Sequence, residues 1–449
     1  MIRLRQDLCV AMVVVMAGLW LSATANAQAP TPTPENAAKY IDATAGMTAD
    51  RAVGMALEHN PEIHAAVKEV EAARALVRQA GLRANPKLTV SGAKMIGGAD
   101  YTTMAEVMLP LELGGRRSAR ITVAERELEV REQDHINHER MLAADVRVKF
   151  GEALAAIMRL AVAEKTLAAA RQTYDLIAAR VTEGKAAPLE QSVFMVEVNR
   201  LASLRETAEG RVETALFELR SLTGMRPEEP MRLKGDFTGM IAALPSLTGS
   251  IDSALKQRPD LEGARSVERL AAARVEQAKS TGRFDASVFS GYQRTDSSFP
   301  VNGFDENGIL TPVRDIFHMF TFGIEMDLPL RNRNQGAVAA AAFEQEAAKS
   351  RIEFGELTIR REVAAGFARY NRAARSLALL QNGVRDQANA NLQVVWQTYE
   401  LGSRSLIDYI GEMRRFLEID NEVVDAELET YLANVEIMRA MNAAELRKK

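Results

Sequence analysis

An internal repeat is the feature of this sequence that most limits its fold. The stretch Ala-Leu-Glu-His-Asn-Pro-Glu-Ile at 56–63 returns as Ala-Leu-Lys-Gln-Arg-Pro-Asp-Leu at 254–261, and the triplet Leu-Pro-Leu at 109–111 returns at 328–330. Each half is predicted to form a helix, two short strands, a very long helix and a returning helix. A duplicated unit of this kind indicates a protein that builds a wall rather than one with a catalytic cleft.

The first part of the chain, residues 1–27, is predicted to be a secretory signal peptide. Arg3 and Arg5 precede an apolar run, and the small residues at 25–27 provide a cleavage site. The only cysteine, Cys9, lies inside this segment. The mature chain is therefore expected to contain no disulfide and no thiolate metal site.

The composition indicates a helix-rich chain with much solvated surface. Charged residues make up 26% and aromatic residues 6% of the sequence, and the formal net charge is −4. This mildly acidic balance argues against a nucleic-acid partner. Beyond the signal peptide no apolar stretch approaches the length of a membrane helix, so entry into a membrane would require strands closed into a barrel.

The predicted organisation is a leader followed by the two repeats. A proline-rich extended leader at 28–47 precedes the body of the chain at 48–449, which comprises repeat 1 at about 48–224, a linker at 225–249 and repeat 2 at about 250–446. Repeat 1 is predicted to contain a helix at 48–83, strands at 86–95 and 102–111, and helices at 116–183 and 189–223. Repeat 2 is predicted to contain a helix at 250–282, strands at 284–294 and 318–330 with an exposed loop at 295–317, and helices at 334–401 and 405–446.

The very long helices determine the predicted architecture. At about 1.5 Å per residue, a helix over 116–183 is a rod of roughly 100 Å, which no ordinary globular domain needs. Its apolar residues recur every three or four positions and predict one narrow packing stripe. The stripe consists of Val146, Phe150, Leu154, Ile157 and either Leu160 or Ala161.

The strand at 318–330 has the clearest alternation in the chain. Phe320, Phe322 and Ile324 alternate with polar residues. This pattern is typical of a strand with lipid on one side and water on the other.

Acidic residues occupy the polar side of the strands. Aligning the two Leu-Pro-Leu triplets makes Glu106 equivalent to Glu325, and Asp327 follows on the same side. Two interpretations are equally open: a ring of acids that favours cations in a pore, or a solvated interior without selectivity.

Both long helices end in a glycine turn that is followed by a carboxylate. Glu190 lies six residues after Gly184, and Asp408 lies six residues after Gly402. Local physical chemistry alone can explain this pattern. Glycine adopts the left-handed conformation that ends a helix, a nearby serine can cap the next helix, and an acid is favourable in its first turn.

The sequence contains no catalytic constellation. It has neither a phosphate-binding loop nor a nucleophile elbow. His135 and His138 share a helix face near Glu139, but two ligands without a third are more typical of a solvated helix than of a zinc site. Methionines such as Met413 and Met438 occupy apolar helix positions and are expected to fill the core. We therefore expect no enzyme activity, no cofactor and no metal site.

The order of these motifs resembles that of the TolC-like outer-membrane efflux proteins. The resemblance covers about residues 50–445 and rests on the duplicated layout, the two glycine turns, and the runs Gly-Gly-Arg-Arg at 114–117 and Arg-Asn-Arg-Asn-Gln-Gly at 331–336. The sequence looks most like the heavy-metal, Czc-type branch. The expected fold is mainly α-helical with a β-barrel portion.

The resemblance implies an assembly in the cell outer membrane. It would be a homotrimer in which each chain gives four strands to one barrel, surrounded by outer-membrane lipid, and its helices to a long periplasmic tunnel. The expected partners are a periplasmic adaptor protein and an inner-membrane pump of the RND type. One chain's strands cannot close a barrel, which independently requires oligomerisation.

The resemblance also assigns roles at the glycine turns. Tyr399, Arg404 and Asp408 match the residues that close the periplasmic end of the tunnel, and Glu190 is assigned to the same gate. The turns themselves are expected to dock the adaptor through Gly184, Lys185, Gly402 and Ser403. The family's next aspartate is replaced by Gly411 with Glu412 beside it, so the gate is expected to be looser or differently charged.

Three functions remain open at this level. The leading one is the outer-membrane channel of a tripartite efflux pump, a passive export duct. The same duct could instead serve a type I protein secretion system. The third is a periplasmic coiled-coil adaptor, although adaptors usually have one helical hairpin where this sequence predicts two.

Overall fold

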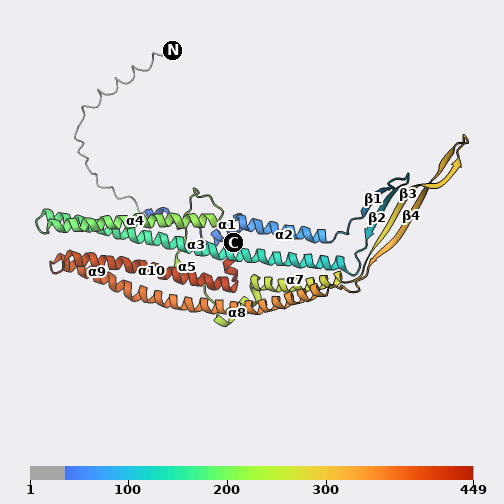
Figure 1. The fold of residues 1–449 in the computed structure, drawn as a ribbon. Coiled ribbons are helices and arrows are strands. Elements are labelled where there is room, and N and C mark those ends of the chain that lie inside the picture. Colours follow the sequence, from blue (N-terminus) through green and yellow to red (C-terminus); the bar gives the residue numbers. More distant parts are fainter. Residues whose placement is uncertain (1–35, 448–449) are drawn as a thin grey trace, which may run out of the picture. The chain divides into compact units, whose positions relative to one another are not determined.

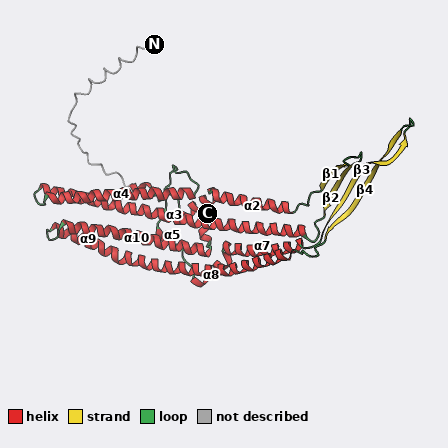
Figure 2. Ribbon diagram, in the orientation of Figure 1, coloured by secondary structure: helices red, strands yellow, loops and turns green. Residues whose placement is uncertain are grey.

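The computed structural model describes residues 36–447, and within this range the chain is mostly helical (Figure 2). The predicted signal peptide and leader residues 28–35 lie outside the described residues. The first half contains η1 (Asn36–Lys39), α1 (Ala49–His59), α2 (Pro61–Ala80), β1 (Lys87–Lys94), β2 (Tyr101–Pro110), α3 (Arg116–Thr182) and α4 (Pro188–Leu222). The second contains α6 (Leu247–Gln257), α7 (Pro259–Thr281), β3 (Asp285–Phe304), β4 (Leu310–Asp327), α8 (Gln335–Leu379), α9 (Arg385–Glu400), α10 (Leu406–Met441) and η3 (Ala444–Arg447).

The opening helix of each repeat was predicted as one helix but is broken in two at the repeated Pro. The break follows Asn60 in repeat 1 and Arg258 in repeat 2, and both residues have extended backbone angles. A residue before proline is disfavoured in the helical region, whereas proline fits the first position of the next helix. The repeated octapeptide therefore encodes a helix junction.

The helices form a wall that is one helix thick. On the side of the strands, the order of neighbours is α2, α3, α7 and α8; on the other side it is α4, α3, α10 and α9 (Figure 1). Helix α3 belongs to both sets, as its predicted length requires. Among the described residues, no helix is long and apolar enough to cross a membrane.

The second rod is interrupted by a π-helical turn. The predicted helix at 334–401 is realised as α8, a π turn at Leu380–Val384 and α9. Single π turns within α-helices are often found at functional sites. No side chain in this turn is buried.

The four strands form one antiparallel sheet in the order β1-β2-β3-β4. The predicted loop at 295–317 is wrong: most of it extends β3 and β4 into a paired ribbon beyond the end of β2. Only the turn between Asp305 and Ile309 remains irregular, and there the Asp305 carboxylate accepts hydrogen bonds from two backbone N–H groups. A bulge interrupts the ribbon between Ser298 and Asn302.

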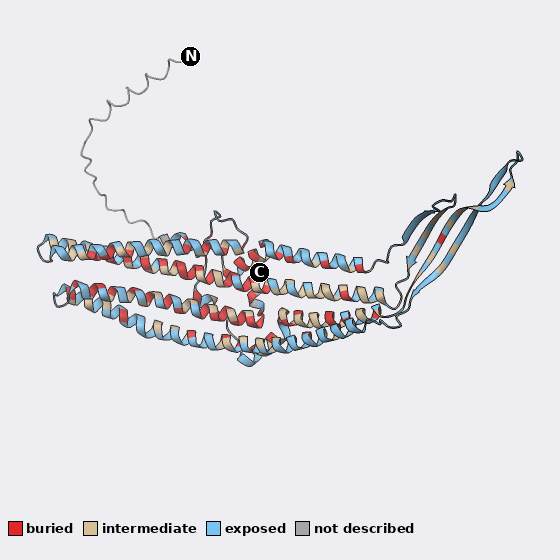
Figure 3. Cartoon of the chain, in the orientation of Figure 1, coloured by how far each residue is buried: buried red, intermediate tan, exposed pale blue. Residues whose placement is uncertain are grey.

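The sheet has one apolar and one polar face, as predicted. Phe320 and Ile324 project to the same side as Phe322, whose residue surface is 87% exposed. The register continues this face across the sheet, because Ile324 pairs with Val288 and Val288 with Leu109. Large apolar side chains are thus left uncovered within the chain (Figure 3).

The main core lies at the middle of α3. The predicted stripe is buried there, and Leu160 rather than Ala161 completes it. The linker crosses this region, with a short helix α5 (Phe237–Met240) and a buried Leu233 that bridges to Ile41 and Met47. The prolines and glycines of the linker predicted this irregular path around the long helices.

Helices α3 and α10 approach each other closely at Gly151. A Cβ atom at this position would lie 2.5 Å from Cε1 of Tyr431. The Tyr431 side chain is fully buried, and its hydroxyl donates to the carbonyl of Arg147 at 3.1 Å. The ring therefore has no room to move away.

Gly151→Ala is expected to destabilise the fold by about 1–3 kcal/mol, because overpacking forces a shift of the helices. Gly210→Ala on α4 is the matched control, since nothing lies within 4 Å of its added methyl group. The control should raise stability by about 0.5–1 kcal/mol through helix propensity. Thermal unfolding followed by circular dichroism measures both; equal midpoints for the two variants would contradict this packing.

Candidate functional site

The two glycine turns share one backbone design. The N–H of Lys185 donates to the carbonyl of Arg180 at 2.8 Å, and that of Ser403 to the carbonyl of Thr398 at 2.9 Å. The preceding glycines have φ angles of +70° and +75°, and nothing lies within 4 Å of the position that a Cβ atom would take. Glycine is needed here for its left-handed conformation, and not to make room.

Asp408 forms a capping box with Ser405. Its carboxylate accepts from the Ser405 hydroxyl at 2.8 Å and from the Ser405 N–H at 3.0 Å, and its own N–H donates to that hydroxyl. These bonds, with the nearby Arg404, hold the pKa of Asp408 below its usual range. The helix-capping role considered from the sequence is therefore present.

Tyr399 and Glu190 are brought together from opposite hairpins. The Tyr399 hydroxyl donates to Oε2 of Glu190 at 2.7 Å, and the guanidinium of Arg180 lies 5.6 Å from the centre of the tyrosine ring. Arg180 also donates to the carbonyl of Glu400 at 3.1 Å. Burial, reinforced by the Glu190 carboxylate, raises the pKa of Tyr399 to about 12. Arg180 was not among the predicted site residues.

Arg404, the remaining predicted gate residue, lines a pocket between the two turns together with two of the predicted docking residues. Its lining includes Lys185, Glu190, Gly402 and Arg404. Arg404 is exposed, and its charge contributes to the lowered pKa of Asp408. The pocket is rich in cations, because Arg180 also contributes to its lining.

A buried acid joins the two hairpins further along. Glu197 of α4 is 2% exposed and receives hydrogen bonds from Arg200 of the same helix and Arg414 of α10. Burial acts to raise the pKa of Glu197, but the two guanidinium groups outweigh it and leave the pKa lowered. The sequence signal was an acid among the buried residues Phe194, Val198 and Leu201.

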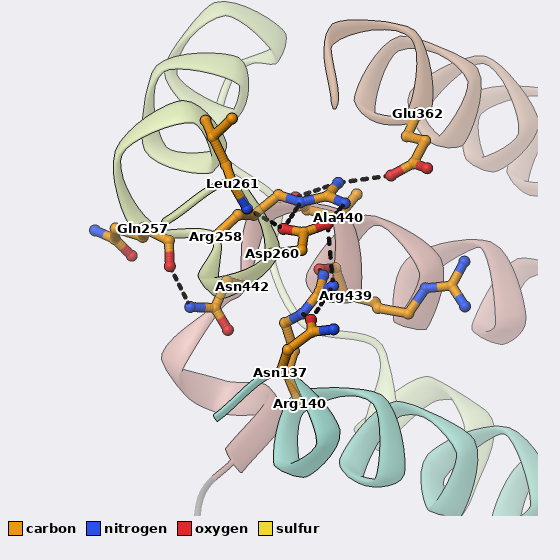
Figure 4. A network of polar contacts seen from close by, with 10 residues as sticks. All are labelled: Asn137, Arg140, Gln257, Arg258, Asp260, Leu261, Glu362, Arg439, Ala440 and Asn442. Atoms are coloured by element: carbon orange, nitrogen blue, oxygen red, sulfur yellow. Dashed lines mark hydrogen bonds and ion pairs between the residues drawn. The ribbon is translucent and has the colours of Figure 1, made fainter. Parts of the chain in front are cut away.

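A second polar network lies where the repeats meet, at the middle of the wall. Arg258 contacts Asp260 at 2.5 Å and Glu362 of α8 at 2.6 Å, and Arg140 of α3 lies 3.5 Å from Asp260 (Figure 4). Burial opposes the charge on Arg258, but these carboxylates raise its pKa overall. Two buried cations thus share Asp260 of α7, and Arg258 also reaches Glu362 of α8.

The pre-proline residue has the same role in both repeats. Asn60 donates to the carbonyl of Leu222 at 3.0 Å, at the end of α4. Arg258 reaches the carbonyl of Ala440 at 3.5 Å, near the end of α10. Each junction therefore satisfies a free carbonyl at the end of the returning helix.

The predicted strand acids lie on the polar face, as expected, but at different positions along the strands. Glu106 pairs with Gly291, whereas Glu325 pairs with Ser287, further along β3. Asp327 pairs with Asp285 at the end of the sheet nearest the helices. Glu106 is half-buried and the other two predicted acids are exposed.

The histidine pair does not gather further ligands. Nε2 of His135 lies 3.7 Å from Glu139, and among the described residues no group of three or more candidate ligands could hold a metal ion. Met413 and Met438 are buried in the core, as their helix positions predicted.

Glu197→Gln is expected to lower stability by about 1–3 kcal/mol at neutral pH, because two charged hydrogen bonds weaken. The folded pKa of Glu197 lies below its unfolded value of about 4.3. The ionised Glu197 carboxylate therefore stabilises the folded state above that pH, and this stabilisation is lost as the pH falls through the folded pKa. Thermal midpoints from pH 7 to about 3 should converge for variant and parent. Glu206→Gln, at an exposed position, is the control. A difference in thermal midpoint between Glu197→Gln and the parent that stays constant from pH 7 to about 3 would contradict this account.

Comparison with known proteins identifies the family. A family model described as outer membrane efflux protein matches residues 52–225 and 250–443. The cobalt-zinc-cadmium resistance protein CzcC of Cupriavidus metallidurans is 23% identical over 403 residues, 89% of this chain and 91% of CzcC. The nickel-cobalt-cadmium resistance protein NccC of Alcaligenes xylosoxydans xylosoxydans is 27% identical over 303 residues, 65% of this chain and 63% of NccC.

Solved structures have the same fold. The structure of CusC superposes with a TM-score of 0.72 at 18% identity, covering 92% of this chain and 97% of CusC. The open state of the MtrE outer membrane channel of Neisseria gonorrhoeae gives a TM-score of 0.68 at 16% identity, covering 89% and 90%. The family match spans both repeats and the fold agrees along nearly the whole chain; this chain therefore belongs to the outer membrane efflux protein family and is an efflux channel of the outer membrane.

Proposed function

We propose that this channel is the passive outer-membrane duct of a tripartite pump that exports divalent metal cations. The relatives CzcC and NccC are named for resistance to cobalt, zinc, cadmium and nickel. The acids Glu106, Glu325 and Asp327 on the polar strand face supply the charge that attracts cations. This shared acidic face is the observation that carries the proposal.

The assembly is a homotrimer. The sheet leaves strands β1 and β4 as unpaired edges within the chain, and the helical wall likewise ends at α2 or α4 on one side and α8 or α9 on the other. Further copies of the chain cover both kinds of edge at once. The apolar sheet face then meets outer-membrane lipid, and the polar face lines the duct.

The partners are a periplasmic adaptor and an inner-membrane pump of the RND type. The two glycine turns, with exposed Gly184, Lys185, Gly402 and Ser403, form the docking end. Family membership sets aside the periplasmic adaptor as an identity for this chain. A duct for type I protein secretion is the remaining alternative, and the cargo test below separates it.

The cargo is tested by deleting the gene in the bacterium that encodes it. The deletion should lower tolerance to Co²⁺, Ni²⁺, Zn²⁺ or Cd²⁺, and the plasmid-borne gene should restore it. A neutralised variant with Glu106→Gln, Glu325→Gln and Asp327→Asn should restore tolerance only partly while reaching the outer membrane in equal amount. Unchanged metal tolerance together with the loss of a secreted protein would support the secretion alternative.

The gate is tested by conductance. If Arg404 of one copy pairs with Asp408 of the next, each exposed bridge contributes about 0.5–1 kcal/mol to closure and occurs in every copy. Arg404→Ser should raise the conductance of the purified trimer in planar bilayers, and high salt should shrink the difference.

Asp408 needs a separate control because it also caps α10. Asp408→Asn weakens the cap and the bridge, whereas Ser405→Ala weakens only the cap. Asp408→Asn should open the gate and Ser405→Ala should only lower the thermal midpoint. Parental conductance in both Arg404→Ser and Asp408→Asn, with intact trimers, would refute this gate.

A further inference from the structure

A border of basic residues crosses the apolar face of the sheet. On this face Tyr292 pairs with Phe320, and the next outward-facing pair is Arg294 with His318. Two pairs further on, Ser298 lies opposite Arg314. These cations lie along the middle and outer part of β4 and beside the ends of β1 and β2 that are remote from the helices, and Ile316 lies between His318 and Arg314 on the same face.

Tyr292 holds the histidine of this border. The Tyr292 hydroxyl and Nδ1 of His318 are 2.6 Å apart, and their rings are stacked with centroids 5.9 Å apart. The Tyr292 ring also lies 5.2 Å from that of Phe320. With Nδ1 engaged by the tyrosine, Nε2 is the ring nitrogen left for a group outside the chain.

The border carries more cations than acids. Arg294, Arg314 and, on β1, Lys94 are exposed cations. The opposing acid on this face is Asp296, whose Oδ2 lies 3.3 Å from Arg294.

Two other acids lie near the border but do not face it. Asp100, in the turn before β2, accepts a hydrogen bond from the N–H of Ser298 at 2.7 Å. Asp315 lies on the opposite face of β4, because it alternates with Arg314. The outward face therefore keeps an excess of positive charge.

We propose that Arg294 and His318, which are paired across β3 and β4, bind the phosphate of an anionic lipid headgroup in the outer leaflet, and that Arg314, four residues further along β4, adds positive charge beside them. This inference rests on the proposed function, in which lipid meets the apolar face. It adds a selective lipid site to a surface that would otherwise be a general contact with the membrane.

The geometry suits a lipid better than a free ion. Phe320, Phe322 and Ile324 continue from the border along one line of the same face, where an acyl chain can lie. Tyr101 and Tyr292 stand at the border itself, at the level where aromatic side chains meet headgroups. A headgroup phosphate would thus meet cations while its chains meet apolar side chains.

The test uses the full mature chain, purified as its assembly in mild detergent. Thermal midpoints are measured during titration with short-chain phosphatidylglycerol, with phosphatidylcholine and with inorganic phosphate. The parent should be stabilised by phosphatidylglycerol at concentrations at which the zwitterionic lipid and free phosphate have little effect. Salt should weaken this stabilisation.

The variant Arg294→Gln with Arg314→Gln removes two of the cations. Each surface cation is worth about fivefold in affinity for an anionic membrane, so the apparent affinity should fall on the order of 25-fold. His318→Gln should reduce it by a few fold. The control Arg351→Gln with Arg375→Gln makes the same charge change on exposed residues of α8 and should bind as the parent does.

Three outcomes would overturn the site: equal stabilisation by both lipids, the same response to inorganic phosphate alone, or unchanged affinity in the Arg294 and Arg314 variant. Midpoints without lipid show whether that variant is folded. These measurements do not depend on the cargo, so they can be interpreted even if the metal-tolerance test fails. A negative result here does not affect the proposed export function.

Discussion

A wall one helix thick cannot bury both of its faces, and most of this structure follows from that constraint. Helix α3 contacts helices of both halves along both parts of its length. Its buried stripe, centred on Phe150 and Leu154, packs against α10 within the wall, and α1 and the linker cover it there. Elsewhere the apolar side chains of the edges and of the sheet stay uncovered until lipid or another copy of the chain meets them.

Buried polar contacts also position the helices. Glu197 joins α4 to α10 and Arg258 joins α7 to α8, each through guanidinium groups with more than one partner. Directional bonds of this kind fix the relative rotation of helices that bury little surface.

Local rules predicted the elements that depend on local physics. The bounds of α3, the left-handed glycines and the cap at Asp408 could all be read from neighbouring residues. The helix break at Asn60 was missed because apolar periodicity continues across it, although the following proline was visible. The ribbon at 295–317 was missed because its Asp, Ser and Gly residues are typical of loops, whereas its stability comes from the partner strand. Contacts between hairpins, such as that of Tyr399 with Glu190, can be predicted only when the neighbouring helices are known. A single sequence does not provide this information.

The pairing of β2 with β3 has a consequence for the order of folding. Each glycine turn joins helices that are adjacent in sequence, so the two helical hairpins can form from local contacts. The sheet is different, since the hydrogen bond between Thr102 and Thr295 spans 193 positions in the chain. Closing such a large loop costs entropy that only the completed sheet repays. The pairing of β2 with β3, like the packing of α3 on α7 and α10, joins the two repeats and is expected to form after the two helical hairpins.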